Sequence, residues 1–419
     1  MQEVHGPDIR PVILGADIGV YALARAFFEA FGVNSTVISS FATGPIAHSS
    51  ICEVHAAGRV MLPNEYVQRA IEFADAWQGP GQLVLLANTD SLIRAIAERV
   101  DELRTRYLLQ VLPMETLDLV SDKASFARLC AEVGVPHPQT VVVDCSGIAD
   151  GAWKAPDVPF AFPVVAKAAK SSDYEGLSFE GKKKVYLIST PDELQELWST
   201  LALAGFRSTF VVQEVIPGDD TQVWSVTAYV NTQGIITLKA AAHVLLEDHA
   251  PSALGNPVAM VTNLRQDLLD YSTKLLERSG YRGFANFDVK VDPRNGTPYF
   301  LEVNPRIGRN NYYATASGAN PASAMMEDLL LDVGASSPHI HLGDKEILYL
   351  VVPLPLLARY IGGEEKANIL RLHKNAAIVH PLRNAQDRAW KRRMYVAQSQ
   401  LNHVYKFLRY YPKPTDTAF

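Results

Sequence analysis

Cysteine is scarce in this chain of 419 residues. The three cysteines, Cys52, Cys130 and Cys145, lie far apart, and none belongs to a C-x-x-C motif. An odd and scattered set provides neither a disulfide framework nor a zinc site of the usual spacing. We therefore expect small buried thiols that stay reduced, as in a cytoplasmic protein.

Long apolar runs and a strong net charge are also missing. No stretch is long enough to span a bilayer, and the N-terminus MQEVHGPDIR lacks the cationic start and apolar run of an export signal. The net charge of -6 is too mild to indicate binding to nucleic acid. The composition, with 48% hydrophobic and 20% charged residues, is that of a globular protein, and the length predicts two or three domains.

Strands and helices alternate in the first part of the chain. The pattern predicts a strand over Ile9–Leu14, a helix over Val20–Phe31 closed by Gly32, and a strand over Thr36–Ser39. These elements form a βαβ unit. The turn before the helix has the wrong spacing for a dinucleotide fingerprint, so we do not expect a nicotinamide cofactor.

Two acidic residues follow strands of this region. Asp17 comes after the first strand, and Asp90 comes after a strand predicted over Gln82–Leu86. Open α/β sheets bind ligands at the carboxyl ends of their strands, which makes both residues candidates for substrate contact. Capping of the following helices explains them equally well.

Residues 286–306 predict a β-hairpin with an acidic residue on each strand. Asn295-Gly296 is a typical hairpin turn, and folding about it places Asp288 opposite Glu302, with Cβ atoms about 4.5–5.5 Å apart. Two carboxylates this close repel each other, and a hard divalent cation removes the penalty. Together with the amide of Asn304, the set suits Mg²⁺. An exposed acidic hairpin without a metal is the plain alternative.

The segment FDVKVD…YFLEVNPR resembles the metal-binding hairpin of the ATP-grasp superfamily. The resemblance implies an α/β fold in which a Rossmann-like pre-ATP-grasp domain precedes a two-subdomain ATP-grasp fold and a C-terminal extension. The expected parts are the N-terminal domain (1–120), the lid subdomain with its connecting helix (121–205), the catalytic, metal-binding subdomain (206–335) and the extension (336–419).

The resemblance also implies the ligands of the site. The family binds ATP with two Mg²⁺ ions, which Mn²⁺ can replace, and the metal ligands carried over are Asp288, Glu302 and Asn304. Lys123, at the start of a helix expected to end at Val133, corresponds to a phosphate contact. Lys167 follows an apolar strand and corresponds to a catalytic lysine near the phosphates and the adenine. The remaining nucleotide contacts implied are a loop over the phosphates (Ser171, Ser172, Gly176), the adenine edge (Gln213, Glu214, Ile216) and the ribose (Asp220).

Plain alternatives exist for several of these residues. A lysine at the end of a strand usually extends into solvent. The stretch around Ser171 has fewer glycines than the family's loops, and a surface hairpin is a serious alternative there. Asp219, beside Asp220, could simply cap the turn.

Cationic and amide side chains follow the hairpin directly. Arg306 is suited to stabilise charge on a transferring phosphoryl group, a catalytic role, whereas Arg309 and Asn310 would face the substrate. A structural salt bridge is the alternative for the two arginines.

The parts together predict an ATP-dependent carboxylate–amine ligase. A substrate carboxylate attacks the γ-phosphorus to give an acyl phosphate, and an amine then displaces phosphate to form an amide. The overall layout is similar to that of D-aspartate ligases of peptidoglycan synthesis, which use an amino-acid carboxylate and a cell-wall precursor as the amine acceptor. Another ATP-grasp ligase, such as an amino-acid or peptide ligase or an enzyme like carbamoyl phosphate synthetase, and a non-catalytic nucleotide-binding module are the alternatives.

The C-terminal region mixes cationic with aromatic residues. Such a segment can bind a UDP- or lipid-linked acceptor or make peripheral contact with a membrane. The alternative, which we prefer, is a helix packed on the body with a solvated basic face. The residues are Arg388, Lys391, Arg392, Arg393, Lys406, Arg409 and Lys413, interleaved with Trp390, Tyr395, Tyr405, Phe407, Tyr410 and Tyr411.

Overall fold

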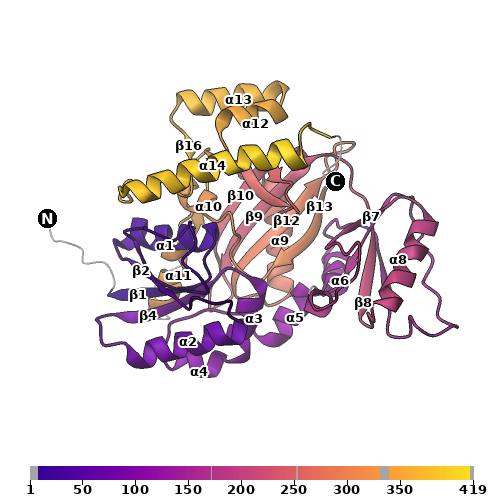
Figure 1. The fold of residues 1–419 in the computed structure, drawn as a ribbon, viewed down its shortest axis with the longest axis horizontal. Helices are drawn as coiled ribbons and strands as arrows, with labels where there is room; N and C mark the ends of the chain where they lie inside the picture. Colours follow the sequence, from indigo (N-terminus) through magenta and orange to yellow (C-terminus); the bar gives the residue numbers. More distant parts are fainter. Residues whose placement is uncertain (1–7, 171, 252, 331–338, 416–419) are drawn as a thin grey trace.

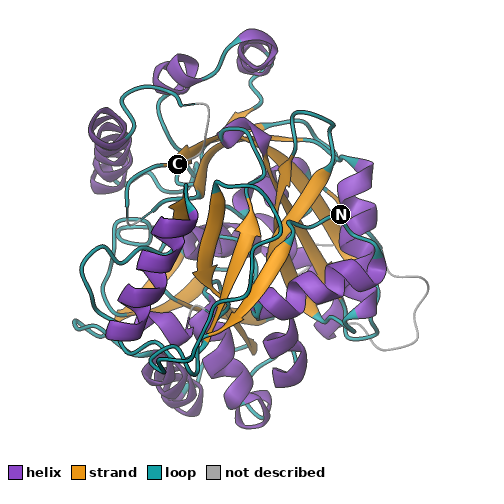
Figure 2. Ribbon diagram, turned by 90° about the vertical axis from the view of Figure 1, so that its right-hand side faces the viewer, coloured by secondary structure: helices purple, strands orange, loops and turns teal. Residues whose placement is uncertain are grey.

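The computed structural model describes residues 8–170, 172–251, 253–330 and 339–415. Three β-sheets organise these residues. Figure 1 shows the N-terminal sheet at one end of the molecule, a small sheet at the other end and the largest sheet between them. Seen from the side, the strands lie in the centre with helices around them (Figure 2).

The N-terminal sheet is parallel, with the strand order β3-β2-β1-β4, and confirms the Rossmann-like prediction. Helix α1 begins where the Asp17 carboxylate accepts hydrogen bonds from two backbone N–H groups, and it ends at Gly32, whose φ of 71° suits glycine. The elements are β1 (Ile9–Leu14), α1 (Ile18–Phe31), β2 (Ser35–Ser39), β3 (Cys52–Ala56), α2 (Pro63–Ala76), β4 (Gln82–Ala87), α3 (Asp90–Glu98), α4 (Val100–Arg104) and α5 (Met114–Ser121).

The small sheet is antiparallel, in the order β5-β8-β6-β7, and we call it the lid sheet. Its core is aromatic, with Trp198, Phe206 and Phe210 in edge-to-face contact. The elements are α6 (Lys123–Val133), which leads into the lid sheet, β5 (Thr140–Asp144), β6 (Val164–Ala168), α7 (Ser172–Glu175), β7 (Tyr186–Ile188), α8 (Pro191–Leu203) and β8 (Thr209–Glu214).

The largest sheet has eight strands and is mostly antiparallel. Seven of them follow the order β13-β12-β9-β10-β11-β15-β16, and β14 pairs with β10. The elements before residue 331 are the 3₁₀-helix η1 (Asp220–Gln222), β9 (Val223–Val230), β10 (Ile236–Asp248), β11 (Asn256–Thr262), α9 (Gln266–Arg278), β12 (Gly283–Val291), β13 (Pro298–Asn304), α10 (Tyr312–Ser317) and α11 (Pro321–Leu330).

The C-terminal extension shares the core of the protein. Its strands β14, β15 and β16 belong to the largest sheet, and its last helix, α14, crosses above the N-terminal domain and that sheet (Figure 1). Apolar residues of α1, β10 and α14 belong to one buried cluster. The elements are β14 (His341–Leu342), β15 (Leu348–Leu350), α12 (Leu354–Tyr360), α13 (Gly363–Lys374), β16 (Ile378–Val379) and α14 (Trp390–Tyr410).

A buried ion pair joins the extension to the N-terminal domain. Asp387 and Arg392 have side chains that are only 1% exposed, and their charged atoms lie 3.4 Å apart. Asp387 also accepts hydrogen bonds from Tyr21 and from the backbone of Ser50, while Arg392 donates to backbone carbonyls at Gly44 and Pro45. The expectation of a packed C-terminal helix is confirmed.

Among the described residues, no helix combines the length and the apolar character that crossing a bilayer requires. Cys130 and Cys145 are buried free thiols, as expected, whereas Cys52 is only partly buried.

Candidate active site

The hairpin formed by β12 and β13 has the register that the sequence predicts. Asp288 pairs directly with Glu302, and Asn286 pairs with Asn304. The Asn304 amide donates to the Asp288 carboxylate over 3.0 Å. Three oxygen-bearing side chains therefore gather on one face of the hairpin.

Two lysines from the lid side face this pair of carboxylates. Helix α6 begins after its N-cap Asp122, and the backbone N–H of Lys123 donates to Ala169 O at the end of β6. This contact places Lys123 near Lys167, which lies on β6. Lys123 Nζ is 3.7 Å from a Glu302 carboxylate oxygen. The structure thus brings both predicted phosphate-binding lysines to the predicted metal ligands.

The pKa values of Asp288 and Glu302 are shifted in opposite directions. Burial, followed by the charge of Glu302, raises the pKa of Asp288 to about 7. Burial alone would also raise the pKa of Glu302, but Lys123, Lys167 and other cations outweigh it and hold that pKa at about 2. Burial lowers the pKa of Lys167 to about 8, although the charge of Glu302 acts against this shift. Lysines neutralise the Glu302 carboxylate, whereas the Asp288 carboxylate has the negative charge of Glu302 as its neighbour.

The donor set fits a metal that arrives with a nucleotide. Within residues 8–170, 172–251, 253–330 and 339–415, no three His, Cys, Asp or Glu side chains converge as a metal site. Two carboxylates and an amide provide only part of an octahedral shell, so phosphates and water must complete it. The raised pKa of Asp288 shows a position where a cation would relieve repulsion.

Side chains proposed for the adenine edge hold the lid sheet in place. Gln213 is buried and donates to Thr140 Oγ1 over 2.9 Å. The Glu214 carboxylate accepts the backbone N–H of Gln139 over 2.9 Å, and Ile216 is buried beyond the strand. Reading of the adenine edge by this segment stays a prediction.

The expected phosphate loop contains a short helix. Ser171 lies outside the described residues, whereas Ser172 begins helix α7 and Gly176 follows this helix as an exposed residue. Tyr174 of α7 is buried against Phe206 and Phe210, so the hydrophobic core of the lid fixes this helix. The sequence missed α7 because a helix of four residues is too short to show a helical periodicity.

Asp220 lies deep in the site, at 3% exposure. One of its carboxylate oxygens accepts hydrogen bonds from Glu247 N and His249 Nε2, each over 2.9 Å. Asp219 caps the 3₁₀-helix η1 by accepting from Thr221, which is the plain alternative noted for it. The assignment of Asp220 to the ribose stays a prediction.

Glu247 and Lys290 belong to the site but were not predicted. Burial, together with Asp220 and then Asp288, raises the pKa of Glu247 to about 8. Lys290 donates to Gly218 O over 2.7 Å and lies near the same acids. The alternation around Asp288 marks Lys290 as being on the same face, but Glu247 had no signal because β10 is an apolar strand in the sequence.

Acids of the N-terminal domain form ion pairs with the arginines after the hairpin. Arg306 Nε lies 3.0 Å from Asp90, and Arg309 Nε lies 3.3 Å from Asp17. Asp17 caps α1 as well. Asp90 is the first residue of α3, and Thr89 occupies the cap position, so the capping explanation of Asp90 was wrong. These pairs place both domains around one site.

Asn310 lies near the hairpin, because a Cβ added at Gly308 would meet the side-chain oxygens of both Asn286 and Asn310 at 2.6 Å. Its side chain is buried, and its amide donates to Met260 Sδ. Substrate contact by Asn310 stays a prediction.

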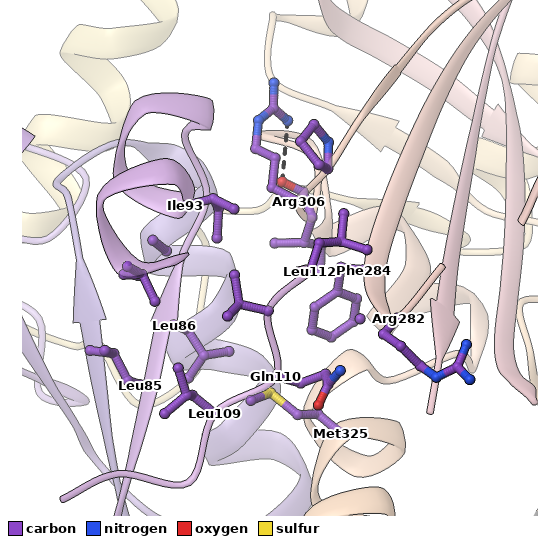
Figure 3. Close-up of a pocket in the computed structure, with 16 residues that line it drawn as sticks. Leu85, Leu86, Ile93, Leu109, Gln110, Leu112, Arg282, Phe284, Arg306 and Met325 are labelled. Atoms are coloured by element: carbon purple, nitrogen blue, oxygen red, sulfur yellow. Dashed lines mark hydrogen bonds between the residues drawn. The ribbon is translucent and has the colours of Figure 1, made fainter. Parts of the chain in front are cut away.

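A small cavity of about 30 Å³ lies behind Arg306, between β4 and the start of β12 (Figure 3). Its walls are mainly aliphatic side chains, including Leu86, Ile93 and Leu112, and the ring of Phe284 lies beside Leu112. This volume holds a water molecule or two and no substrate.

Residues 237–325 match the family described as the ATP-binding domain of the carbamoyl-phosphate synthase L chain. The chain is 27% identical to D-aspartate ligase of Enterococcus faecium, over 98% of this chain and 99% of that protein. Both matches agree with the resemblance to the ATP-grasp superfamily that the hairpin residues indicate.

Other relatives cover less of the chain or share its fold alone. It is 22% identical to the carbamoyl phosphate synthase large chain of Rubrobacter xylanophilus, over 52% of this chain and 19% of that protein. Among solved structures, an ADP complex of N5-carboxyaminoimidazole ribonucleotide synthetase aligns with a TM-score of 0.53 at 15% identity, covering 83% of this chain and 82% of the other. L-amino acid ligase from Bacillus licheniformis aligns with a TM-score of 0.53 at 15% identity, covering 77% and 75%. These structures share the fold of this chain.

Proposed function

We propose that this ATP-grasp ligase joins a carboxylate to an amine through an acyl phosphate, with D-aspartate as the carboxylate substrate. The observation that carries the proposal is the facing pair Asp288 and Glu302 with Lys123 and Lys167 beside it. A relative named D-aspartate ligase that aligns over 98% of the chain supports the choice of substrate.

Each group of site residues would have its own role in the reaction. Lys123 and Lys167 bind the anionic phosphates, while Asp288, Glu302 and Asn304 are the side chains that would hold Mg²⁺. When bound, Mg²⁺ supplies charge neutralisation to the ATP phosphates. The α7 segment and the lid sheet exclude water, which would otherwise hydrolyse the acyl phosphate.

The ion pairs between the N-terminal domain and the segment after the hairpin are suited to binding an amino acid. Asp17 and Arg309 are 35% and 44% exposed at their side chains and lie 3.3 Å apart. An amino acid carries an ammonium and at least one carboxylate, and this pair offers a partner for each sign. Arg306, which donates a hydrogen bond to Asp90, would neutralise the acyl phosphate.

The outer face of α14 suits an anionic acceptor such as a UDP- or lipid-linked cell-wall precursor. The helix contains no Asp or Glu. Its outward side exposes the apolar residues Trp390, Met394, Leu401, Tyr405 and Leu408, beside the exposed cations Lys391, Arg393 and Arg409. If the acceptor is lipid-linked, we expect the protein to sediment with anionic vesicles but not with zwitterionic vesicles. If the protein sediments with neither, the result would point to a UDP-linked acceptor in the cytoplasm.

The test of the function is ADP release screened over amino acids and amine acceptors, with Glu302→Gln as the control. We expect ADP release with D-aspartate, little with L-aspartate, and a loss of about 100-fold or more in the variant. Activity with other amino acids would instead favour the amino-acid ligase alternative, as would the structural likeness to L-amino acid ligase. Activity with bicarbonate alone would exclude D-aspartate, and binding of Mg-ATP without any ADP release would indicate a non-catalytic module.

A further inference from the structure

The C-terminal extension reaches the site at the end of strand β10. There, Glu247, Asp248 and His249 lie between the buried carboxylate of Asp220 on one side and helix α14 on the other. A role for this arrangement in nucleotide binding rests on the proposed function of Asp220 as the acceptor of the ribose hydroxyls.

His249 connects the two sides. Its Nε2 donates to Asp220 Oδ2 over 2.9 Å, and both side chains are almost fully buried, at 7% and 5% exposure. The imidazole ring lies flat on the ring of Tyr411, with centroids 3.6 Å apart and an angle of 4° between the planes. Because a stacked ring cannot tilt, Tyr411 fixes the direction in which Nε2 points.

Tyr411 is itself held by the extension. Tyr360 donates its hydroxyl to Tyr411 O over 2.5 Å, and its ring stacks on the ring of Tyr411 at 5.4 Å. One turn earlier on α14, Lys406 donates to Asp248 Oδ2 over 3.2 Å, beside His249. The end of β10 is therefore attached to α14 at two successive residues.

The two oxygens of Asp220 differ in their surroundings. Oδ2 accepts from Glu247 N and His249 Nε2, which fixes the rotation of the carboxylate. Oδ1 is buried and accepts no hydrogen bond from the part of the chain that the structure describes. A buried carboxylate oxygen without a partner is costly, so it marks a position where a ligand donor would be favourable.

We propose that His249, stacked on Tyr411, is a positioning residue for Asp220, so that the C-terminal helix sets the affinity of the site for ATP. The two rings turn Oδ1 of Asp220 toward the ribose hydroxyl donors. Neither His249 nor Tyr411 touches the reacting atoms, so the effect falls on nucleotide binding and not on the chemical step.

The experiment compares two neighbouring tyrosines of the full-length protein. Tyr411→Ala removes the stacked ring, Tyr411→Phe keeps it, and Tyr410→Ala removes an exposed ring that makes a cation–π contact only with Arg409 among the described residues. The readouts are the Kd of Mg-ADP by titration calorimetry, KM for ATP, kcat, KM for the amino acid, and the melting temperature without nucleotide.

We expect Tyr411→Ala to raise the Kd of Mg-ADP and KM for ATP about tenfold, which corresponds to about 1.4 kcal/mol, with kcat changed less than twofold. His249→Ala should do the same, whereas Tyr411→Phe and Tyr410→Ala should behave like the parent protein. KM for the amino acid should not move. A purely structural role predicts instead a lower melting temperature with nucleotide affinity unchanged.

The outcomes separate this inference from the proposed function. Unchanged nucleotide affinity in both Tyr411→Ala and His249→Ala overturns the positioning role and leaves the ligase assignment standing. Weakened Mg-ADP binding together with no ligase activity in the parent protein supports the positioning role and overturns the ligase assignment. A parent protein that binds no nucleotide overturns both.

Discussion

Replacing Asp387 with Asn should strongly destabilise the protein. The substitution keeps the shape of the side chain but removes the negative charge that faces Arg392, 3.4 Å away. Arg392 is 1% exposed, and two of its nitrogens, Nε and Nη2, already lack hydrogen-bond acceptors among the described residues. The variant therefore leaves a buried guanidinium without a counter-charge.

The expected cost is about 3–5 kcal/mol, as is typical for breaking a buried ion pair on one side. An unfolding entropy of about 2.1 cal/mol/K per residue gives about 0.9 kcal/mol/K for a chain of this length, so the melting temperature should fall by about 3–6 °C. The assay is differential scanning calorimetry of the parent and Asp387→Asn. Because Asp387 anchors α14, KM for ATP should rise as well.

Two variants serve as controls for this prediction. Arg278 and Glu132 form a surface pair with side chains 56% and 52% exposed, so Glu132→Gln should shift the melting temperature by less than about 1 °C. The double variant Asp387→Asn/Arg392→Met removes the orphaned charge and should recover much of the loss. An Asp387→Asn protein that melts like the parent would refute the reasoning.

Three further outcomes are expected. Gly19→Ala should lower the free energy of unfolding by about 1–3 kcal/mol and lower activity, because the new Cβ would lie 2.9 Å from the Arg309 backbone. Gly151→Ala, whose Cβ would meet no atom within 4 Å, is the control in thermal melts. Burial, and then the charge of Arg383, lowers the pKa of His380 to about 3. Below pH 6.5 the unfolded chain therefore binds a proton that the folded chain does not, and the free energy of unfolding should fall by about 1 kcal/mol per pH unit. His380→Gln should flatten this slope, measured in thermal melts at pH 5 and 7.5. Chelation by EDTA should stop ADP release, and Mg²⁺ or Mn²⁺ should restore it; release that persists in EDTA would contradict a metal at the hairpin.

Local signals were enough to predict the hairpin and the start of helix α6. The register of Asp288 and Glu302 follows from strand alternation and the Asn295-Gly296 turn, which act within twenty residues. Helix α6 has its cap at Asp122 and its stop at Gly134, where φ is 68°. These features depend on neighbouring residues, so the sequence shows them directly.

The partners of the site residues could not be predicted in this way. Arg309 meets Asp17 across 292 positions of the chain, and His249 meets Asp220 on one side and Tyr411 on the other. Nothing in the local pattern around β10 distinguishes Glu247 from a solvent-facing glutamate. Its place beside Asp220 follows from the packing of η1 against that strand.

By itself, the sequence determined the hairpin, the caps of α1 and α6, and which side chains share one face of the hairpin, because backbone geometry and residue type fix these over short distances. Only the tertiary structure decided that lysines from the lid side face those carboxylates, that Asn310 is buried, and that the C-terminal helix packs beside the buried acid Asp220. Burial and electrostatic pairing depend on segments that are far apart in the chain and meet only when the sheets pack together.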